Sequence, residues 1–309
     1  MKRSRQRLLN VLMFVLFLGI LVWMVLQAGP RQLWDTICSM PGTIVLCVLV
    51  WLVGYLFNTA SFHEVLLGMQ PSLRPQLGFW SLFRLTITGY AINYITPFGL
   101  LGGEPYRVLK LRNIMGGVKP ATKGVVLYST MHVVSHIILW NIALVASFFV
   151  IDGEAFSKAT SSFTLAAFSL GGMVNFINWR QMEPGSRYRA LTYEFISRVV
   201  NVFEYQLIMQ ALGFTSFGYV EAYICVAFSS LFANLLFFSP MQMGTREGGI
   251  FLVLQLLLPD LDPASLLAVS VSLSFGTRVR EFIWVIIGLL FVDWSAQQQV
   301  QEECQPKIN

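Results

Sequence analysis

Long apolar runs recur along this chain, and each is long enough to cross a lipid bilayer as a helix. A transmembrane helix needs about 20 mostly apolar residues. Six runs meet this length: 8–27, 42–66, 124–151, 159–177, 189–212 and 264–292. The chain is 55% hydrophobic and 12% charged, whereas an average soluble domain is about 25% charged. The sequence therefore predicts an all-α, polytopic transmembrane helix bundle with about six full spans.

Two further apolar segments, 79–112 and 217–258, are interrupted by proline and glycine. The interruptions read TPFGLLGGEPYR and SPMQMGTREGGI, and each has a glutamate seven residues after a proline: Glu104 after Pro97, and Glu247 after Pro240. Proline breaks a helix and glycine permits a tight turn. We expect each segment to enter as a helix, break and return, which makes a re-entrant hairpin.

The distribution of charge predicts from which side each hairpin enters. Five basic residues lie in or just after the first hairpin, between Arg107 and Lys123, and cytoplasmic segments are enriched in Lys and Arg. The first hairpin is therefore predicted to enter from the cytoplasm. The loop after the second hairpin holds Asp260 and Asp262 and no basic residue, which predicts that the second hairpin enters from outside.

The two halves of the chain then repeat one order of elements with opposite orientation. Each half has two spans, a hairpin and a final span, so we predict an inverted repeat of 1–151 and 159–292 within one integral membrane domain, 1–309. Residues 293–309 are predicted to form a polar cytoplasmic tail. Four basic residues precede the first span, so both termini are expected in the cytoplasm of a cell inner membrane protein.

The broken hairpins carry the first group of candidate binding residues. Backbone groups freed at such a break line a cavity rather than face lipid, and helix N-termini there attract anions. Arg107 and Arg246 are suited to bind a lipid phosphate by forked hydrogen bonds. Glu104 and Glu247 would position these arginines, bind a proton or cation, or pair with an amine of the substrate. The alternative is that each glutamate only caps a helix or neutralises its neighbouring arginine.

Charged residues inside the spans form a second group. Arg278, Arg280 and Glu281 lie near the middle of 264–292, and charges at that depth usually face the interior of a bundle. A substrate site and a structural role near a water-filled vestibule both remain open for them. Glu194 and Arg198 are four residues apart, which favours an internal salt bridge.

Other kinds of site find little support. His132 and His136 share a helical face, but two ligands are too few for zinc, so we expect a hydrogen-bonded polar stripe and no metal or other cofactor. The sequence contains no P-loop, GxSxG or HExxH motif. Its basic residues are not arranged for binding nucleic acid.

The motifs NYITPFGLLGGEPYRVLKLR at 93–112 and SPMQMGTREGG at 239–249, with GTRVREFIWVIIGLL at 276–290, resemble the transmembrane region of lysylphosphatidylglycerol synthase, a flippase-like family. The resemblance covers nearly the whole chain. It implies that the following positions are functional: Pro97, Gly102, Gly103, Glu104, Arg107, Pro240, Gly244, Arg246 and Glu247. In the full-length family enzyme the aminoacyl transfer belongs to a separate soluble domain, so no synthase activity is expected of this chain.

The sequence supports two candidate functions from different classes. The first is a flippase that moves a phosphate-bearing lipid between leaflets: an aminoacyl-phospholipid, a glycolipid or a polyisoprenyl-phosphate lipid. The alternative is an intramembrane lipid-phosphate transferase, or an accessory subunit of a synthase. We expect a transporter rather than an enzyme, with an anionic lipid as its ligand and a separate synthase or glycosyltransferase as its partner.

Overall fold

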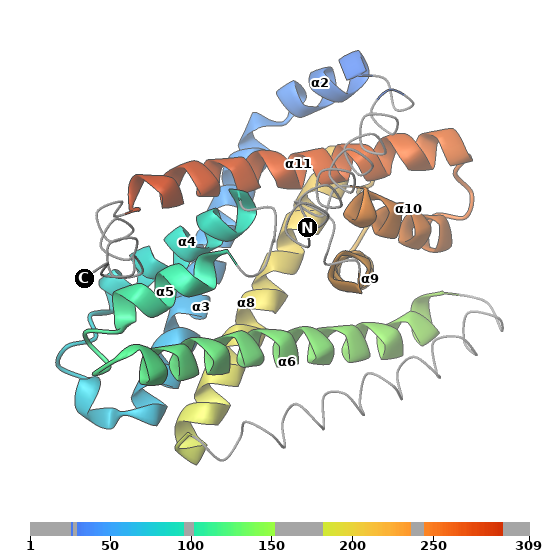
Figure 1. Cartoon of the computed structure of the whole chain (residues 1–309). Helices are drawn as coiled ribbons and strands as arrows, with labels where there is room; N and C mark the ends of the chain where they lie inside the picture. Colours follow the sequence, from blue (N-terminus) through green and yellow to red (C-terminus); the bar gives the residue numbers. More distant parts are fainter. Residues whose placement is uncertain (1–25, 27–29, 96–101, 152–181, 236–243, 293–309) are drawn as a thin grey trace, which may run out of the picture.

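The computed structural model describes residue 26 and residues 30–95, 102–151, 182–235 and 244–292, and every regular element in these ranges is helical (Figure 1). The elements are α2 (Pro30–Ser39), α3 (Pro41–Met69), the short 3₁₀ helix η1 (Pro71–Leu73), α4 (Phe79–Ile95), α5 (Gly103–Leu111), α6 (Val118–Val150), α8 (Pro184–Ala211), α9 (Tyr219–Leu235), α10 (Thr245–Leu257) and α11 (Pro263–Leu290). The all-α prediction is confirmed. The predicted spans 8–27 (apart from residue 26) and 159–177, the tail 293–309 and both prolines of the breaks lie outside the described residues.

Four of the predicted spans correspond to long helices. The runs 42–66, 124–151, 189–212 and 264–292 become α3, α6, α8 and α11, with ends that shift by a few residues. Among the described helices, α3 and α6 are long and apolar enough to cross a membrane. The other two, α8 and α11, carry the charged residues that the sequence placed inside spans.

Asp262 caps the N-terminus of α11. The hydrogen bond that it accepts from the Ser265 hydroxyl holds the pKa of Asp262 below its usual value.

Helix α11 exposes apolar side chains and buries charged ones, unlike a surface helix of a soluble protein. Large apolar side chains are exposed at one-turn spacing on α11, at Phe282, Ile286 and Leu290, whereas arginines and glutamates of the same helix are buried. Charged residues are almost never fully buried in soluble proteins unless they are paired. This is the arrangement that lipid requires. Trp34 on α2 is likewise exposed.

Each interrupted segment forms two helices that pack against each other, α4 with α5 and α9 with α10. Glycine allows the close contact in both. A Cβ on Gly103 would overlap the carbonyl oxygen of Gly89, and a Cβ on Gly249 would lie 3.0 Å from that of Phe232. The backbone N–H of Gly103 donates to Oδ1 of Asn93 at 2.5 Å. This bond satisfies a backbone N–H at the start of α5, next to the break.

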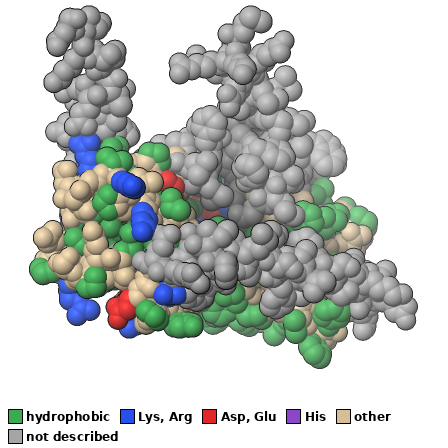
Figure 2. Space-filling model, turned by 60° about the horizontal axis from the view of Figure 1, so that its bottom comes forward, with side chains coloured by type: hydrophobic (Ala, Val, Ile, Leu, Met, Phe, Trp, Pro, Cys, Tyr) green, Lys and Arg blue, Asp and Glu red, His purple; other side chains and the backbone are tan. Residues whose placement is uncertain are grey.

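Two hydrophobic clusters mark opposite ends of the bundle, and antiparallel helices α3 and α8 run between them. One cluster joins the end of α3 and the start of α4 to the end of α5 and the start of α6. We call this the basic end, because Arg74, Arg112, Lys119 and other basic residues lie there; Figure 2 shows Lys and Arg side chains gathered to one side of the visible face. The other cluster joins the end of α6, the start of α9, the end of α10 and the start of α11, beside Asp260 and Asp262.

The packing of the helices has a regular correspondence between the two halves. Helix α4 packs on α11, and α9 packs on α6. In the same way α5 packs on α6 and α10 on α11, while α3 packs on α11 and α8 on α6. Exchanging α3, α4, α5 and α6 with α8, α9, α10 and α11 therefore reproduces the pattern of contacts.

Candidate functional site

Six charged side chains from three helices form a buried group around the middle of α11. We call it the α11 cluster. Its members are Glu204 from α8, Arg246 and Glu247 from α10, and Arg278, Arg280 and Glu281 from α11. All but Arg246 have side chains that are less than a tenth exposed. The structure thus brings the second-hairpin residues together with the charged residues predicted in the last span.

Helix α10 is joined to α11 by two separate ion pairs. Glu247 Oε1 accepts hydrogen bonds from Nη2 and Nε of Arg278 at 2.6 and 3.0 Å, and from the Ser274 hydroxyl at 2.6 Å. Arg246 Nη1 donates to Glu281 Oε1 at 2.5 Å. Glu247 therefore forms its ion pair with Arg278 on α11 and not with its neighbour Arg246. Adjacent residues on a helix point in different directions, so each finds its partner on α11.

The cluster extends from α11 to α8 and α3. Arg280 donates to both carboxylate oxygens of Glu204, at 2.7 and 2.8 Å. The Trp51 indole N–H donates to the same carboxylate at 2.6 Å, and the guanidinium of Arg280 lies 3.8 Å from the centre of a Trp51 ring. This forked pair with a cation–π contact is the geometry that arginine provides and lysine does not.

The first hairpin holds its charges locally. Arg107 Nη1 donates to Glu104 Oε1 at 2.7 Å, three residues away on α5, as the alternative interpretation predicted. Nη2 of Arg107 also donates to the carbonyl of Thr86 on α4 at 3.3 Å, and its guanidinium lies 5.5 Å from the centre of the Tyr128 ring on α6. Arg107 fills the space beside Gly89, which leaves no room for a side chain there.

One turn after Tyr128, a second polar group joins α6 to α8. Nδ1 of His132 lies 2.7 Å from Oε1 of Glu194, and Nη2 of Arg198 donates to the same oxygen at 3.0 Å. Arg198 also contacts the His132 ring and, at 3.5 Å, the Ser135 hydroxyl. The internal salt bridge predicted for Glu194 and Arg198 is confirmed. We call the following five residues the α6 cluster: His132, Glu194, Arg198, Glu104 and Arg107.

Both clusters are balanced in charge. The α11 cluster has three arginines and three glutamates, and the α6 cluster has two of each. Burying an ion costs several kcal/mol unless it is paired, so this balance is what a buried site in lipid requires. Among the described residues, one carboxylate oxygen remains without a hydrogen bond on each of Glu104, Glu194, Glu247 and Glu281.

The two clusters differ in accessibility. The side chain of Glu104 is 20% exposed, whereas that of Glu247 is fully buried. The second hairpin is tied to α11 by two ion pairs, but the ion pair of the first hairpin lies within α5. The two hairpin glutamates therefore differ in exposure, although Arg246 beside Glu247 is 17% exposed.

The glycines singled out in the hairpins have different roles. Gly244 has φ +75°, a left-handed conformation that favours glycine. Gly103 is helical and is needed for the contact with Gly89, not for a turn. Gly102 has right-handed helical angles, so its conformation does not require glycine. Pro97 and Pro240 lie outside the described residues.

Sequence reasoning did not pair Glu204 with Arg280, and it did not select Trp51. The only signal for Glu204 in the sequence is its charge within an apolar span. Trp51 has no such signal, because the chain is rich in aromatic residues. Within the described ranges no three His, Cys, Asp or Glu side chains gather as a metal site would require.

Comparison with known proteins identifies a family for this chain but no individual relative. Neither the curated proteins nor the solved structures include a match to this chain. A model of the lysylphosphatidylglycerol synthase TM region matches residues 10–183, which include α2 to α6 and the first hairpin. This range is narrower than the predicted resemblance, so the likeness of 239–249 and 276–290 to the family stays a prediction. A match over more than half of the 309 residues places this chain, as a membrane protein, in the family of the lysylphosphatidylglycerol synthase TM region.

Proposed function

We propose that this protein moves a phosphate-bearing lipid between the leaflets of the cytoplasmic membrane. The observation that carries the proposal is the pair of charge-balanced clusters, each of which contains the glutamate of one hairpin. Polar networks of this kind inside a membrane protein are expensive, and they mark substrate and ion pathways. Lipid transport also fits the membership of a family named for a lipid synthase.

The arginines of the clusters would bind the lipid phosphate by exchanging partners. A phosphate offers an arginine the same forked hydrogen bonds as a carboxylate. Removing one partner from a buried ion pair costs about 3–5 kcal/mol, so an arginine leaves its glutamate only when another anion replaces it. Arg107 is the first candidate, because its partner Glu104 is partly exposed. The released glutamate would then take a proton, a cation or an amine of the headgroup.

The two hairpins would give the lipid access from opposite faces of the membrane. Helices α4 and α5 meet the basic end, whereas α9 and α10 meet the other end. The matching contacts of the two halves support an inverted repeat, in which a binding site between related elements opens to each side in turn. The positive-inside rule would place the basic end, and with it both termini, in the cytoplasm.

Reconstitution in liposomes tests this function. The purified full chain should speed the exchange of fluorescent phosphatidylglycerol between leaflets. Each of Glu104→Gln and Glu247→Gln should slow the exchange by about tenfold or more, which corresponds to a barrier about 1.4 kcal/mol higher. Glu64→Gln is the matched control, because Glu64 pairs with the half-exposed Arg189 outside both clusters.

The outcomes separate the proposal from its alternatives. Equal exchange by the wild type and the Glu104→Gln/Glu247→Gln double variant would exclude the clusters as the pathway. Chemical conversion of the lipid by the purified protein, with a donor substrate present, would instead favour an intramembrane transferase. If a lipid is modified only when a separate synthase or glycosyltransferase is added, transport would serve that partner.

A further inference from the structure

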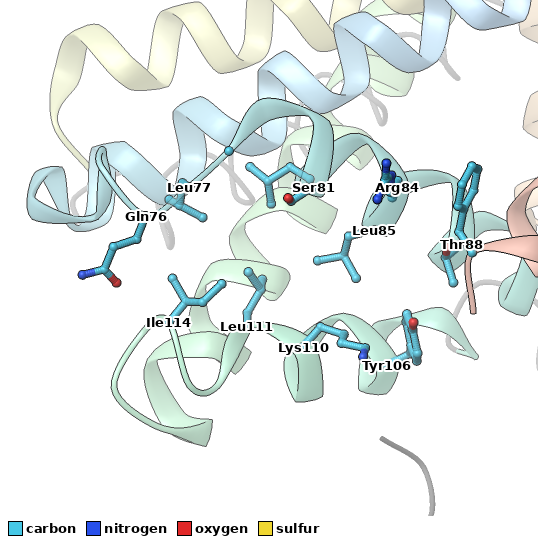
Figure 3. Close-up of a pocket in the computed structure, with 13 residues that line it drawn as sticks. Gln76, Leu77, Ser81, Arg84, Leu85, Thr88, Tyr106, Lys110, Leu111 and Ile114 are labelled. Atoms are coloured by element: carbon cyan, nitrogen blue, oxygen red, sulfur yellow. The ribbon is translucent and has the colours of Figure 1, made fainter. Parts of the chain in front are cut away.

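A pocket of about 240 Å³ lies at the basic end, outside both charged clusters, between α4 and α5 (Figure 3). Phe291, just after α11, also lines it. Arg84 lines the pocket from α4 and Lys110 lines it from α5, so the two cations belong to facing helices. The guanidinium of Arg84 lies 5.5 Å from the centre of the Phe291 ring.

Unlike the two clusters, the described lining of this pocket contains charged side chains of one sign. Two of its described lining residues are cationic and none is Asp or Glu. The Ser81 hydroxyl adds a polar group near Arg84, while Leu85 and Ile114 supply apolar walls. A positive pocket with apolar walls favours a ligand that joins an anion to a hydrocarbon chain.

The surroundings of the pocket indicate its depth in the membrane. Trp80, one turn before Arg84, is 66% exposed, and tryptophan is enriched at the level of the lipid headgroups. Arg84 is exposed and Lys110 is half-buried. Pockets that enclose a drug-sized ligand measure roughly 300–1,000 Å³. This smaller pocket suits a headgroup whose acyl chains stay in the bilayer.

We propose that the Arg84–Lys110 pocket binds the phosphate of an anionic phospholipid and is the loading site for transport. Lys110 follows Arg107 by three residues on α5, a rise of about 4.5 Å, and Tyr106 lines the pocket beside them. A phosphate held here is therefore one helical turn from the ion pair of the first hairpin. The role in loading rests on the proposed transport function, whereas the binding does not.

Binding is tested first, with the full chain in mild detergent and native mass spectrometry as the readout. The probes are dioctanoyl phosphatidylglycerol, dioctanoyl phosphatidylcholine and inorganic phosphate. Phosphatidylglycerol should bind most tightly, because phosphatidylcholine carries a compensating positive charge and inorganic phosphate has no chain for the apolar walls. Arg84→Gln and Lys110→Gln should each weaken phosphatidylglycerol binding by about tenfold, the effect of losing one charge-assisted hydrogen bond.

Lys119→Gln is the matched control, since Lys119 is an exposed cation of the basic end that does not line the pocket. Unchanged melting temperatures of the variants would show that they fold. Equal binding of the two lipids, equal binding of inorganic phosphate, or equal loss in Lys119→Gln would each overturn the site. Selective loss in Arg84→Gln and Lys110→Gln would support it.

Transport kinetics then test separately whether the pocket binds lipid and whether the protein transports it. In liposomes, Arg84→Gln should raise the phosphatidylglycerol fraction needed for half-maximal exchange and leave the maximal rate unchanged. If the wild type moves no lipid but the pocket variants still lose binding, the transport function fails and the binding site stands. If the wild type moves lipid and the variants bind it as before, the site fails and the function stands.

Discussion

The two hairpin glutamates differ in how far each side chain depends on its partner. Glu247 has no exposed surface and three hydrogen bonds to one carboxylate oxygen. Replacing it by glutamine removes the carboxylate with which the buried Arg278 forms its ion pair. We expect Glu247→Gln to lower the free energy of unfolding by about 3–5 kcal/mol, measured by reversible denaturation in detergent micelles.

A double-mutant cycle identifies the cause of this loss. Adding Arg278→Gln to Glu247→Gln should recover part of the stability, because the double variant buries no unpaired charge. The matched control is Glu64→Gln, whose partner Arg189 has a side chain 51% exposed; exposed pairs contribute about 0–1 kcal/mol. Losses in the cycle that simply add would show that Glu247 and Arg278 do not depend on each other.

Alanine substitutions at two adjacent glycines of α10 separate the effect of close packing on stability from the effect of helix propensity. A Cβ on Gly248 meets nothing within 4 Å, whereas a Cβ on Gly249 would lie 3.0 Å from Phe232 Cβ and 3.2 Å from Ser229 Cα on α9. We expect Gly249→Ala to destabilise the protein by about 1–3 kcal/mol through overpacking. Gly248→Ala should be neutral or stabilise it by up to about 1 kcal/mol, because alanine favours a helix.

Thermal unfolding of the two variants checks this contrast between sites that share a helix and a substitution. Equal shifts in melting temperature would contradict the close contact of α9 with α10. A shift for Gly249→Ala alone would confirm that the second hairpin is held together by backbone approach, as the first hairpin is at Gly89 and Gly103.

The helices were predictable from the sequence because bilayer thickness fixes their length and the apolar runs mark them. Glu104 and Arg107 were also predictable as a pair, since residues three apart are neighbours on a helix. Glu247 and Arg278 are 31 residues apart, and Glu204 and Arg280 are 76 apart. Such partners meet only when whole helices pack, so a single sequence shows the charges but not their pairing.

The molecule as a whole combines a repeated packing pattern with opposite charge at its two ends. Gln76 precedes α4 at the basic end, and Asp260 follows α10 at the other end; both are exposed. If the halves form an inverted repeat, these two positions lie on opposite sides of the membrane. We expect Asp260→Cys to react with an impermeant maleimide in right-side-out vesicles, and Gln76→Cys to react in inside-out vesicles.

The background for this labelling replaces Cys38, which is exposed, and Cys304 by serine; Cys47 and Cys225 are buried. Glu183→Cys should react from the same side as Gln76→Cys, because Met182 beside it packs in the cluster of the basic end. Reaction of Gln76→Cys and Asp260→Cys from one side would rule out hairpins that enter from opposite faces. Alternating access through two related hairpins would then lose its geometric basis, whereas the binding pocket at the basic end would not, since it is built within the first hairpin and the end of α11.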